Sequence, residues 1–314
     1  MIRTSFQRMH PFLQFIFIIC LIFSGMAVAS FSGFFLVSAA LGHSLEEAMA
    51  IASSANSEEG KYYNLFVNGL NQLFAFGLVA GFVGWLFSQR TFVTFRSLSW
   101  QWLIIGIMLA WAAQPLIDLT FRLNDGLITF LPDAWAETIY NLEATATDIT
   151  RSMLTFDTTW QFLATALTVA VLPAVCEELI FRGVLQPLIS KWTGNAHLGI
   201  WVSALLFSAI HLQFQGFLPR MILGAGLGYL VVYSQSLWPS IAAHFFNNFA
   251  AIFMAYYMGP EWIETEMNAV SAWDYQDFLV AIVALMIGVL AILWVRKLGK
   301  WTDDHPVTDV TVSQ

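Results

Sequence analysis

The sequence predicts an all-α protein, a polytopic membrane bundle of about eight transmembrane helices with both termini in the cytoplasm. Of the 314 residues, 58% are hydrophobic and only 11% are charged, whereas soluble domains contain about 25% charged residues. Apolar runs long enough to cross a bilayer, which takes about 20 residues, recur along the whole chain. We therefore expect a multi-pass protein of the cell membrane, with the lipid bilayer as its main partner.

Hydropathy places eight helices at 11–41, 64–88, 99–122, 158–190, 197–215, 217–235, 237–258 and 277–297. The first resembles a signal peptide, since Arg3 and Arg8 precede it and the small residues AVA stand at 27–29. Its apolar run continues to about residue 41, so a retained helix is favoured. Pro173 predicts a kink in the fourth helix. The stretch LEATATDITRSML (142–154) predicts a further, interfacial helix.

Lysine and arginine near the ends of spans set the orientation of a membrane protein, because they stay on the cytoplasmic side. With a cytoplasmic N-terminus, the inner side contains Arg3, Arg8, Arg90, Arg96, Lys191, Arg296, Lys297 and Lys300. The outer side contains Lys61, Arg122 and Arg151, with Arg220 near an outer boundary. This asymmetry predicts that both termini are cytoplasmic.

The remaining composition excludes several classes of function. The formal net charge is −8 and no basic patch is present, so nucleic acid is not expected as a partner. Cys20 and Cys176 both fall in apolar segments, which disfavours a structural disulfide or a cysteine metal site. Cys176 also lacks a local activating group and is disfavoured as a nucleophile. The sequence does not indicate an oligomeric state.

Ionisable side chains at membrane depth are energetically costly and usually face a bundle interior or a wet cavity. Asp118 lies near the outer end of the third predicted span, where it could reach the interface, and the others lie in the second half of the chain. They are Glu177, Glu178, Arg182, His211 and His244, with the amides Asn247 and Asn248 beside them. We therefore expect scaffold helices and outer loops in 1–150, a core of helices four to seven in 151–260, and the last helix with a cytoplasmic tail in 261–314. All three parts are expected to form one structural domain.

Helical spacing sorts these side chains by face. Residues four apart share a face, which groups Glu178 with Arg182, Phe207 with His211, and His244 with Asn248. Glu177 then points about 100° away from Glu178. A carboxylate and two imidazoles in one cavity could activate water and stabilise an oxyanion. Taken singly, these residues also fit a structural role as an ion pair or as interhelical hydrogen bonders.

Three ordered motifs resemble the CPBP family of intramembrane proteases, which includes the CAAX prenyl endopeptidases and the Abi proteins. The family pattern is E-E-x-x-x-R, then F-x-x-x-H, then H-x-x-x-N. Here it reads EELIFR (177–182), FSAIH (207–211) and HFFNN (244–248), without a gap or substitution. Each motif is weak alone, but the ordered set on successive apolar helices is specific. The resemblance covers about residues 155–258.

The resemblance implies an intramembrane endopeptidase of the CAAX type, acting on a peptide or protein substrate in or near the membrane, which is lipidated in prenyl-processing members. Glu177 would activate the attacking water, aided by His211. His244 and Asn248 would form the oxyanion pocket. Glu178 and Arg182 would be a supporting pair, with Phe207 beside the imidazole of the second motif.

The family has been described both as metalloendopeptidases and as glutamate proteases. A zinc ion held by Glu177, His211 and His244 is therefore the alternative to a metal-free site. We favour the site without a cofactor, because the sequence contains no H-E-x-x-H motif and the three ligands would have to converge from three helices.

Two other functions remain open at this stage. A non-catalytic member of the same family could bind a partner through the same cavity, for example in immunity to a peptide toxin. A proton-coupled transporter is less favoured, because it predicts paired helix breaks in repeated halves and no repeat is visible.

One feature of the predicted spans disagrees with a shared site. At 1.5 Å per residue, His211 would lie about 20 Å from the inner end of its helix and His244 about 10 Å. For His211 and His244 to reach one cavity, the helices must be tilted, the fourth must kink at Pro173, or the fifth must begin at a different residue.

Overall fold

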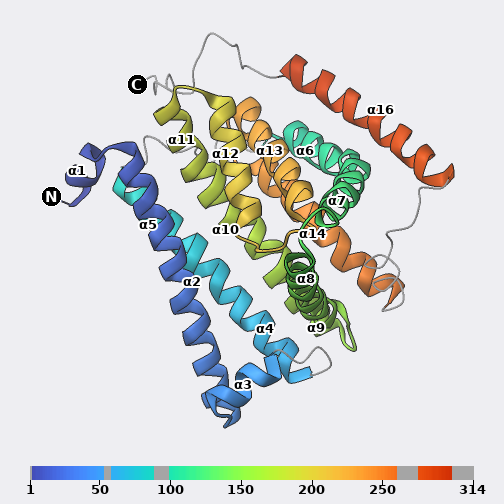
Figure 1. Ribbon diagram of the computed structural model, residues 1–314. Coiled ribbons are helices and arrows are strands. Elements are labelled where there is room, and N and C mark those ends of the chain that lie inside the picture. Colours follow the sequence, from blue (N-terminus) through green and yellow to red (C-terminus); the bar gives the residue numbers. More distant parts are fainter. Residues whose placement is uncertain (1, 53–57, 88–98, 260–274, 299–314) are drawn as a thin grey trace.

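The computed structural model describes residues 2–52, 58–87, 99–259 and 275–298, which form a helical bundle without a strand (Figure 1). Within these residues, six helices are long and apolar enough to cross a membrane: 11–41, 58–87, 100–128, 159–193, 217–234 and 275–298. The predicted all-α, polytopic class is confirmed. The count of eight spans, the cytoplasmic termini and the division at residues 150 and 260 stay predictions, and Arg90, Arg96 and Lys300 lie outside the described residues.

The first two spans form an antiparallel pair (Figure 1). The first is α2 (Pro11–Leu41), with the bounds that hydropathy predicts. The second is a continuous helix of α4 (Glu58–Asn71), η1 (Gln72–Leu78) and α5 (Val79–Phe87), and it begins six residues before the predicted start at 64. Short helices precede and join them, α1 (Ile2–Arg8) and α3 (Leu45–Ala52).

The third span, 100–128, consists of two consecutive helices. α6 (Trp100–Ala112) meets α7 (Gln114–Ile128) at Ala113, and Pro115 stands in the first turn of α7. Proline is compatible with a first turn because it needs no hydrogen bond from its nitrogen there. α8 (Asp133–Leu154) confirms the helix predicted at 142–154 and starts nine residues earlier.

The fourth span changes helical register twice. It runs through α9 (Thr159–Thr165), η2 (Ala166–Val171), α10 (Leu172–Ile180), η3 (Phe181–Leu185) and α11 (Gln186–Thr193), where η2 and η3 are π-helical. Pro173 stands in the first turn of α10, directly after η2. π-helical turns rotate the faces before and after them relative to one another and often occur at functional sites. The predicted irregularity near Pro173 is therefore a π segment.

The fifth predicted helix, 197–215, is wrong at its end. α12 (Ala196–Ala209) has 14 residues, and His211 lies in the turn that follows rather than in the helix. Leu212, directly after His211, has a positive φ of 53°, which is incompatible with a continuing α-helix. α13 (Phe217–Ser234), α14 (Trp238–Met258) and α16 (Tyr275–Leu298) agree with the predicted helices to within two residues.

The fourth span occupies the middle of the bundle, between the α2–α4 pair on one side and α6, α7 and α16 on the other (Figure 1). Its residues Ile180 and Phe181 pack with Phe76 and Val83 in the main apolar cluster. Large apolar side chains on α2 and α16 are exposed, among them Phe31 and Leu285. Outward-facing apolar surface of this extent fits a lipid environment and not water.

Candidate active site

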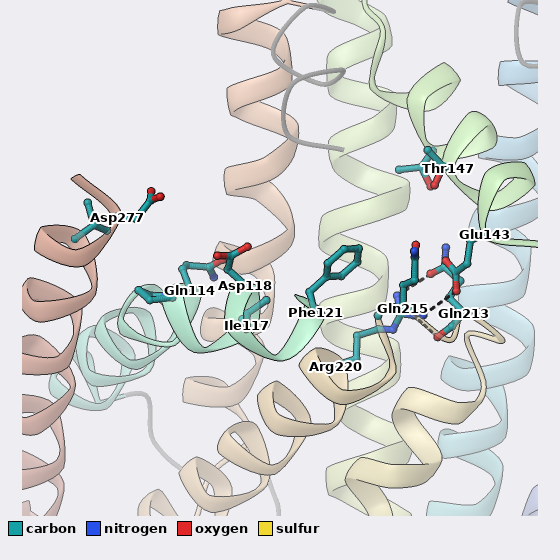
Figure 2. A pocket seen from close by; sticks show the side chains of 14 residues that line it. Gln114, Ile117, Asp118, Phe121, Glu143, Thr147, Gln213, Gln215, Arg220 and Asp277 are labelled. Atoms are coloured by element: carbon teal, nitrogen blue, oxygen red, sulfur yellow. Dashed lines mark hydrogen bonds between the residues drawn. The ribbon is translucent and has the colours of Figure 1, made fainter. Parts of the chain in front are cut away.

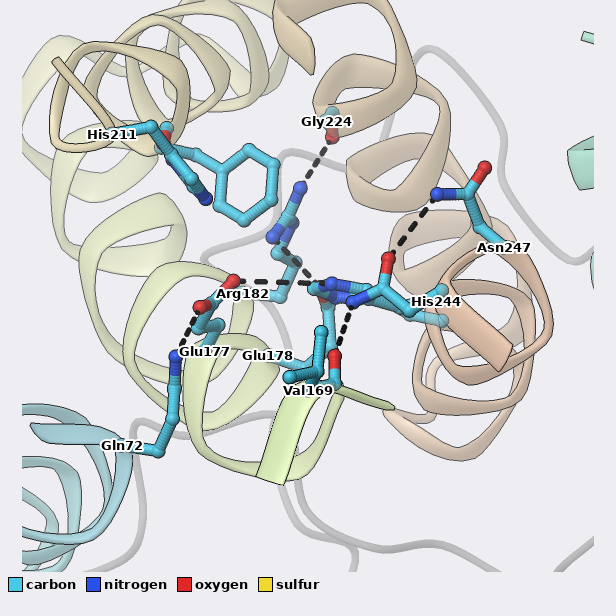
Figure 3. A network of polar contacts seen from close by, with 12 residues as sticks. Gln72, Val169, Glu177, Glu178, Arg182, His211, Gly224, His244 and Asn247 are labelled. Atoms are coloured by element: carbon cyan, nitrogen blue, oxygen red, sulfur yellow. Dashed lines mark hydrogen bonds and ion pairs between the residues drawn. The ribbon is translucent and has the colours of Figure 1, made fainter. Parts of the chain in front are cut away.

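Glu178 is the centre of a fully buried polar network (Figure 3). Its Oε1 atom accepts a hydrogen bond from Arg182 Nη1 at 2.8 Å and lies 2.9 Å from His244 Nδ1. Its other oxygen accepts a hydrogen bond from the hydroxyl of Ser240. The predicted i,i+4 ion pair is thus present, and its carboxylate also reaches α14. Charges at this depth are tolerated only when paired and hydrogen-bonded, and every oxygen of Glu178 is engaged.

Arg182 completes the network on its far side. Its Nη2 donates to the carbonyl oxygen of Gly224 in α13 at 2.9 Å. Its guanidinium carbon also lies 4.6 Å from the centre of the Phe207 ring, in cation–π geometry. Arg182 therefore connects α13 and α12 to the helix that contains the two glutamates.

Glu177 points to a different face, as its spacing predicts. Its Oε1 accepts a hydrogen bond from Gln72 Nε2 at 2.8 Å, and its Oε2 lies 3.8 Å from His244 Nε2. His244 consequently has one nitrogen toward each glutamate. Because a carboxylate accepts hydrogen bonds, the Nδ1 atom on Glu178 bears a proton and the Nε2 atom faces Glu177.

His211 reaches the same region as His244. The Phe207 ring centroid lies 5.3 Å from that of His211 and 5.7 Å from that of His244, both edge-on. His211 Nδ1 donates to the carbonyl oxygen of Phe207 at 2.8 Å, which leaves Nε2 of the neutral ring as an acceptor. Figure 3 shows the ring of His211 turned toward Glu177. Because both imidazoles contact the Phe207 ring, His211 and His244 lie close together, and the difference in depth expected from the predicted spans is not present.

Asn248 lies one turn beyond His244 and is held from the fourth span. Its Nδ2 donates to the carbonyl oxygen of Val169 in η2 at 3.0 Å, and its Oδ1 accepts from Asn247 at 3.2 Å. Asn247 in turn accepts from Gln114 Nε2 of α7 at 3.0 Å. An amide held by one of its two N–H groups has a second N–H that can donate to a substrate.

Side chains from three helices form hydrogen bonds with the turn that follows His211. Arg220 of α13 donates to the side chain and to the carbonyl of Gln213 at 2.6 and 3.0 Å. Glu143 of α8 accepts the backbone N–H of Gln215 at 2.9 Å, and Asn124 of α7 donates to the carbonyl of Gln215 at 3.1 Å. These bonds hold a segment that sequence reasoning placed in a helix.

A polar cavity of about 590 Å³ lies beside this turn (Figure 2). Arg220, Gln213, Gln215 and Glu143 line one part of it, and Gln114 and Asp118 another. Gln114 links the cavity to the site through its bond to Asn247. Its volume is in the range of ligand sites in proteins.

A zinc ion would need the donor atoms of Glu177, His211 and His244 to surround one point. In the part of the chain that the structure describes, no group of three or more His, Cys, Asp or Glu side chains is arranged to hold a metal ion. The residues Glu177, His211 and His244 therefore do not fit a zinc site in this geometry. Metal dependence stays a prediction for experiment.

Two contacts were missed by sequence reasoning. Gln72 is one of several amides in the second span, and nothing in the sequence separates it from Asn64, Asn68 and Asn71. Val169 contributes a backbone carbonyl, which no side-chain pattern shows. By contrast, Cys176 is buried in the main apolar cluster. It takes no part in the network.

One family of known proteins matches part of the chain. The model of the type II CAAX prenyl endopeptidase Rce1-like family matches residues 159–250, a segment that contains all three motifs. No curated protein and no solved structure shows a significant match to the chain.

Proposed function

Because residues 159–250 belong to the type II CAAX prenyl endopeptidase Rce1-like family, a family of membrane proteases, we propose that this chain is an intramembrane endopeptidase of the glutamate type. Its substrate is a peptide or protein held in or beside the bilayer. The observation that carries the proposal is the 3.8 Å separation of Glu177 Oε2 and His244 Nε2, both buried. A water molecule that lies beside this pair can be within hydrogen-bond distance, about 2.8 Å, of both atoms.

In the first step, Glu177 takes a proton from this water while the oxygen attacks the carbonyl carbon of the scissile bond. His211 assists, because the free lone pair on its Nε2 can accept the second hydrogen of the same water. The carbonyl oxygen becomes an oxyanion. The free N–H of Asn248, and Nε2 of His244 when the ring is protonated, donate to it. Glu177 then returns its proton to the departing amine.

Glu178 and Arg182 do not contact the substrate in this mechanism, and their role is to hold His244 in place. Glu178 fixes the tautomer and the orientation of His244 through Nδ1, and Arg182 balances its charge. A carboxylate that orients a histidine in this way is a recurring part of hydrolytic sites.

The polar cavity beside the turn offers room for the water-soluble part of a peptide next to the bond that is cut. The substrate class that fits is therefore a peptide whose polar segment reaches the cavity while an apolar or lipidated segment stays in the membrane. We place the protein in the cell membrane with both ends in the cytoplasm, as the lysine and arginine distribution indicates.

The test uses the purified full-length chain in liposomes with a panel of prenylated and unmodified peptides, read by mass spectrometry. Wild type is expected to cut at least one peptide, and Glu177→Ala and Glu177→Gln are expected to cut none. Glu46→Gln, on the exposed surface of α3, is the matched control and should cut as wild type does. Absence of cleavage by wild type across the panel would favour the non-catalytic binding protein. Cleavage by Glu177→Ala would refute the mechanism.

A further inference from the structure

We propose that Gln72 is a positioning residue for Glu177, so that both halves of the chain build the active site. The inference rests on the proposed function and extends it to the second span. Gln72 lies outside residues 159–250, the segment that the family model matches. It also lies in the part that the sequence assigns to the scaffold.

The contact is direct and buried. Gln72 Nε2 donates to Glu177 Oε1 at 2.8 Å, and the two residues are 6% and 4% exposed. Figure 3 shows the side chain reaching from its helix toward the carboxylate. Placing an amide in an apolar helix costs free energy unless the amide is hydrogen-bonded. Its partner here is the one carboxylate that the proposed mechanism uses as a base.

The hydrogen bond from Gln72 to one carboxylate oxygen of Glu177 also fixes the direction of the other oxygen. The terminal torsion of a glutamate side chain is broad, so a carboxylate without a fixed partner samples many orientations. With Oε1 engaged by Gln72, Oε2 faces His244 Nε2. Gln72 is neutral and fixes Glu177 without forming an ion pair, which leaves the carboxylate able to accept a proton.

Two further features of Gln72 agree with a role at the site. It is the first residue of the π-helical segment η1, and π segments are frequent at functional sites. The carbonyl Oε1 of its amide is buried and has no hydrogen-bond partner among the described residues. A buried acceptor of this kind can take a donor from the attacking water or from a backbone N–H of the substrate.

The chain provides a matched control in Gln186. This glutamine is 4% exposed, its Nε2 donates to the carbonyl of Gly228 at 3.2 Å, and its Oε1 also has no partner in the described part. The difference that the experiment uses is the partner, since Gln186 binds a backbone carbonyl and Gln72 binds the catalytic carboxylate. Any effect of losing a buried amide alone should therefore appear equally in both.

The first experiment compares Gln72→Met and Gln186→Met in liposomes, on a peptide that wild type cuts. Gln72→Met should lower kcat by about 100-fold, the cost of misplacing a reacting group by about 1 Å, with KM changed less than about threefold. Gln186→Met should keep the kcat of wild type. Thermal unfolding should show similar losses of stability for the two. An unchanged kcat in Gln72→Met, or an equal loss in Gln186→Met, would overturn the proposal.

The second experiment needs no turnover, so it separates this proposal from the proposed function. The infrared carboxylate band of Glu177 is identified as the band that disappears in Glu177→Gln. Gln72→Met should shift that band, and Gln186→Met should not. A band unmoved by Gln72→Met would refute the contact, whether or not any peptide is cleaved.

Discussion

The imidazole Nδ1 of His244 lies 2.9 Å from the carboxylate Oε1 of Glu178, which is completely buried. The two residues belong to the first and third sequence motifs, on α10 and α14, and are 66 residues apart. Glu178 is therefore more than the partner of Arg182, because it also determines which nitrogen of His244 faces Glu177.

Replacing Glu178 by glutamine should affect both folding and activity. The substitution leaves the buried Arg182 without a charge partner, and removing one partner of a buried pair costs about 3–5 kcal/mol. Thermal unfolding in detergent should show a large loss of stability, and cleavage should fall with it. Asp118→Asn is the control, since its pair with Arg122 is partly exposed and should contribute less than about 1 kcal/mol. Equal destabilisation by the two variants would contradict this account of the network.

Asn248→Ala tests the oxyanion role. Loss of one such donor costs about 100- to 1,000-fold in kcat, and we expect a decrease of that size with little change in KM. Asn247→Ala removes the neighbouring amide, which has no proposed contact with substrate, and should lower kcat by less than about tenfold. If both variants lose stability and activity in equal measure, the two asparagines serve only to join helices.

Two glycines of α13 offer a test of packing against the site. A Cβ atom on Gly224 would lie 3.2 Å from Arg182 Nη2 and 3.2 Å from Phe207 Cδ1, whereas one on Gly226 would meet nothing within 4 Å. Gly→Ala in a helix is otherwise stabilising by about 0.5–1 kcal/mol. Gly226→Ala should therefore keep or raise the melting temperature and retain activity. Gly224→Ala should lower activity, and a Gly224→Ala variant as active as wild type would show that the network tolerates displacement.

Arg220→Gln addresses the turn that contains His211. The variant removes the charged donor to Gln213, so His211 should be held less firmly. We expect a decrease in kcat of about 10-fold, as for loss of part of general-base assistance. Arg122→Gln, which removes an arginine of a partly exposed pair on α7, should leave kcat unchanged. The measurement is the cleavage rate at saturating peptide, and a larger effect of Arg122→Gln would refute the role assigned to Arg220.

Removal of metal ions tests the zinc alternative directly. The donor geometry leads us to expect full activity after dialysis against a chelator, and less than one zinc per chain by elemental analysis. Loss of activity that zinc restores would establish a metalloendopeptidase. It would also require Glu177, His211 and His244 to converge further than they do here.

Features that depend on local spacing were predictable. Apolar length marked the position of the six described helices that can span a membrane. The four-residue interval correctly predicted the pairing of Glu178 with Arg182 and the contact of Phe207 with His211. The separate direction of Glu177 followed from the same geometry. These predictions succeeded because the 3.6-residue period of a helix is a local property of the chain.

Only the tertiary structure decided what meets across helices. The bond from Gln72 to Glu177 joins residues 105 apart, and no spacing rule reaches that far. The π segments changed the helical register in two spans, and α12 ended before His211. By itself, the sequence determined a membrane bundle and three motifs on known faces. Packing between helices brought those faces to one depth, because the contacts that place them are non-local and depend on irregularities that hydropathy does not encode.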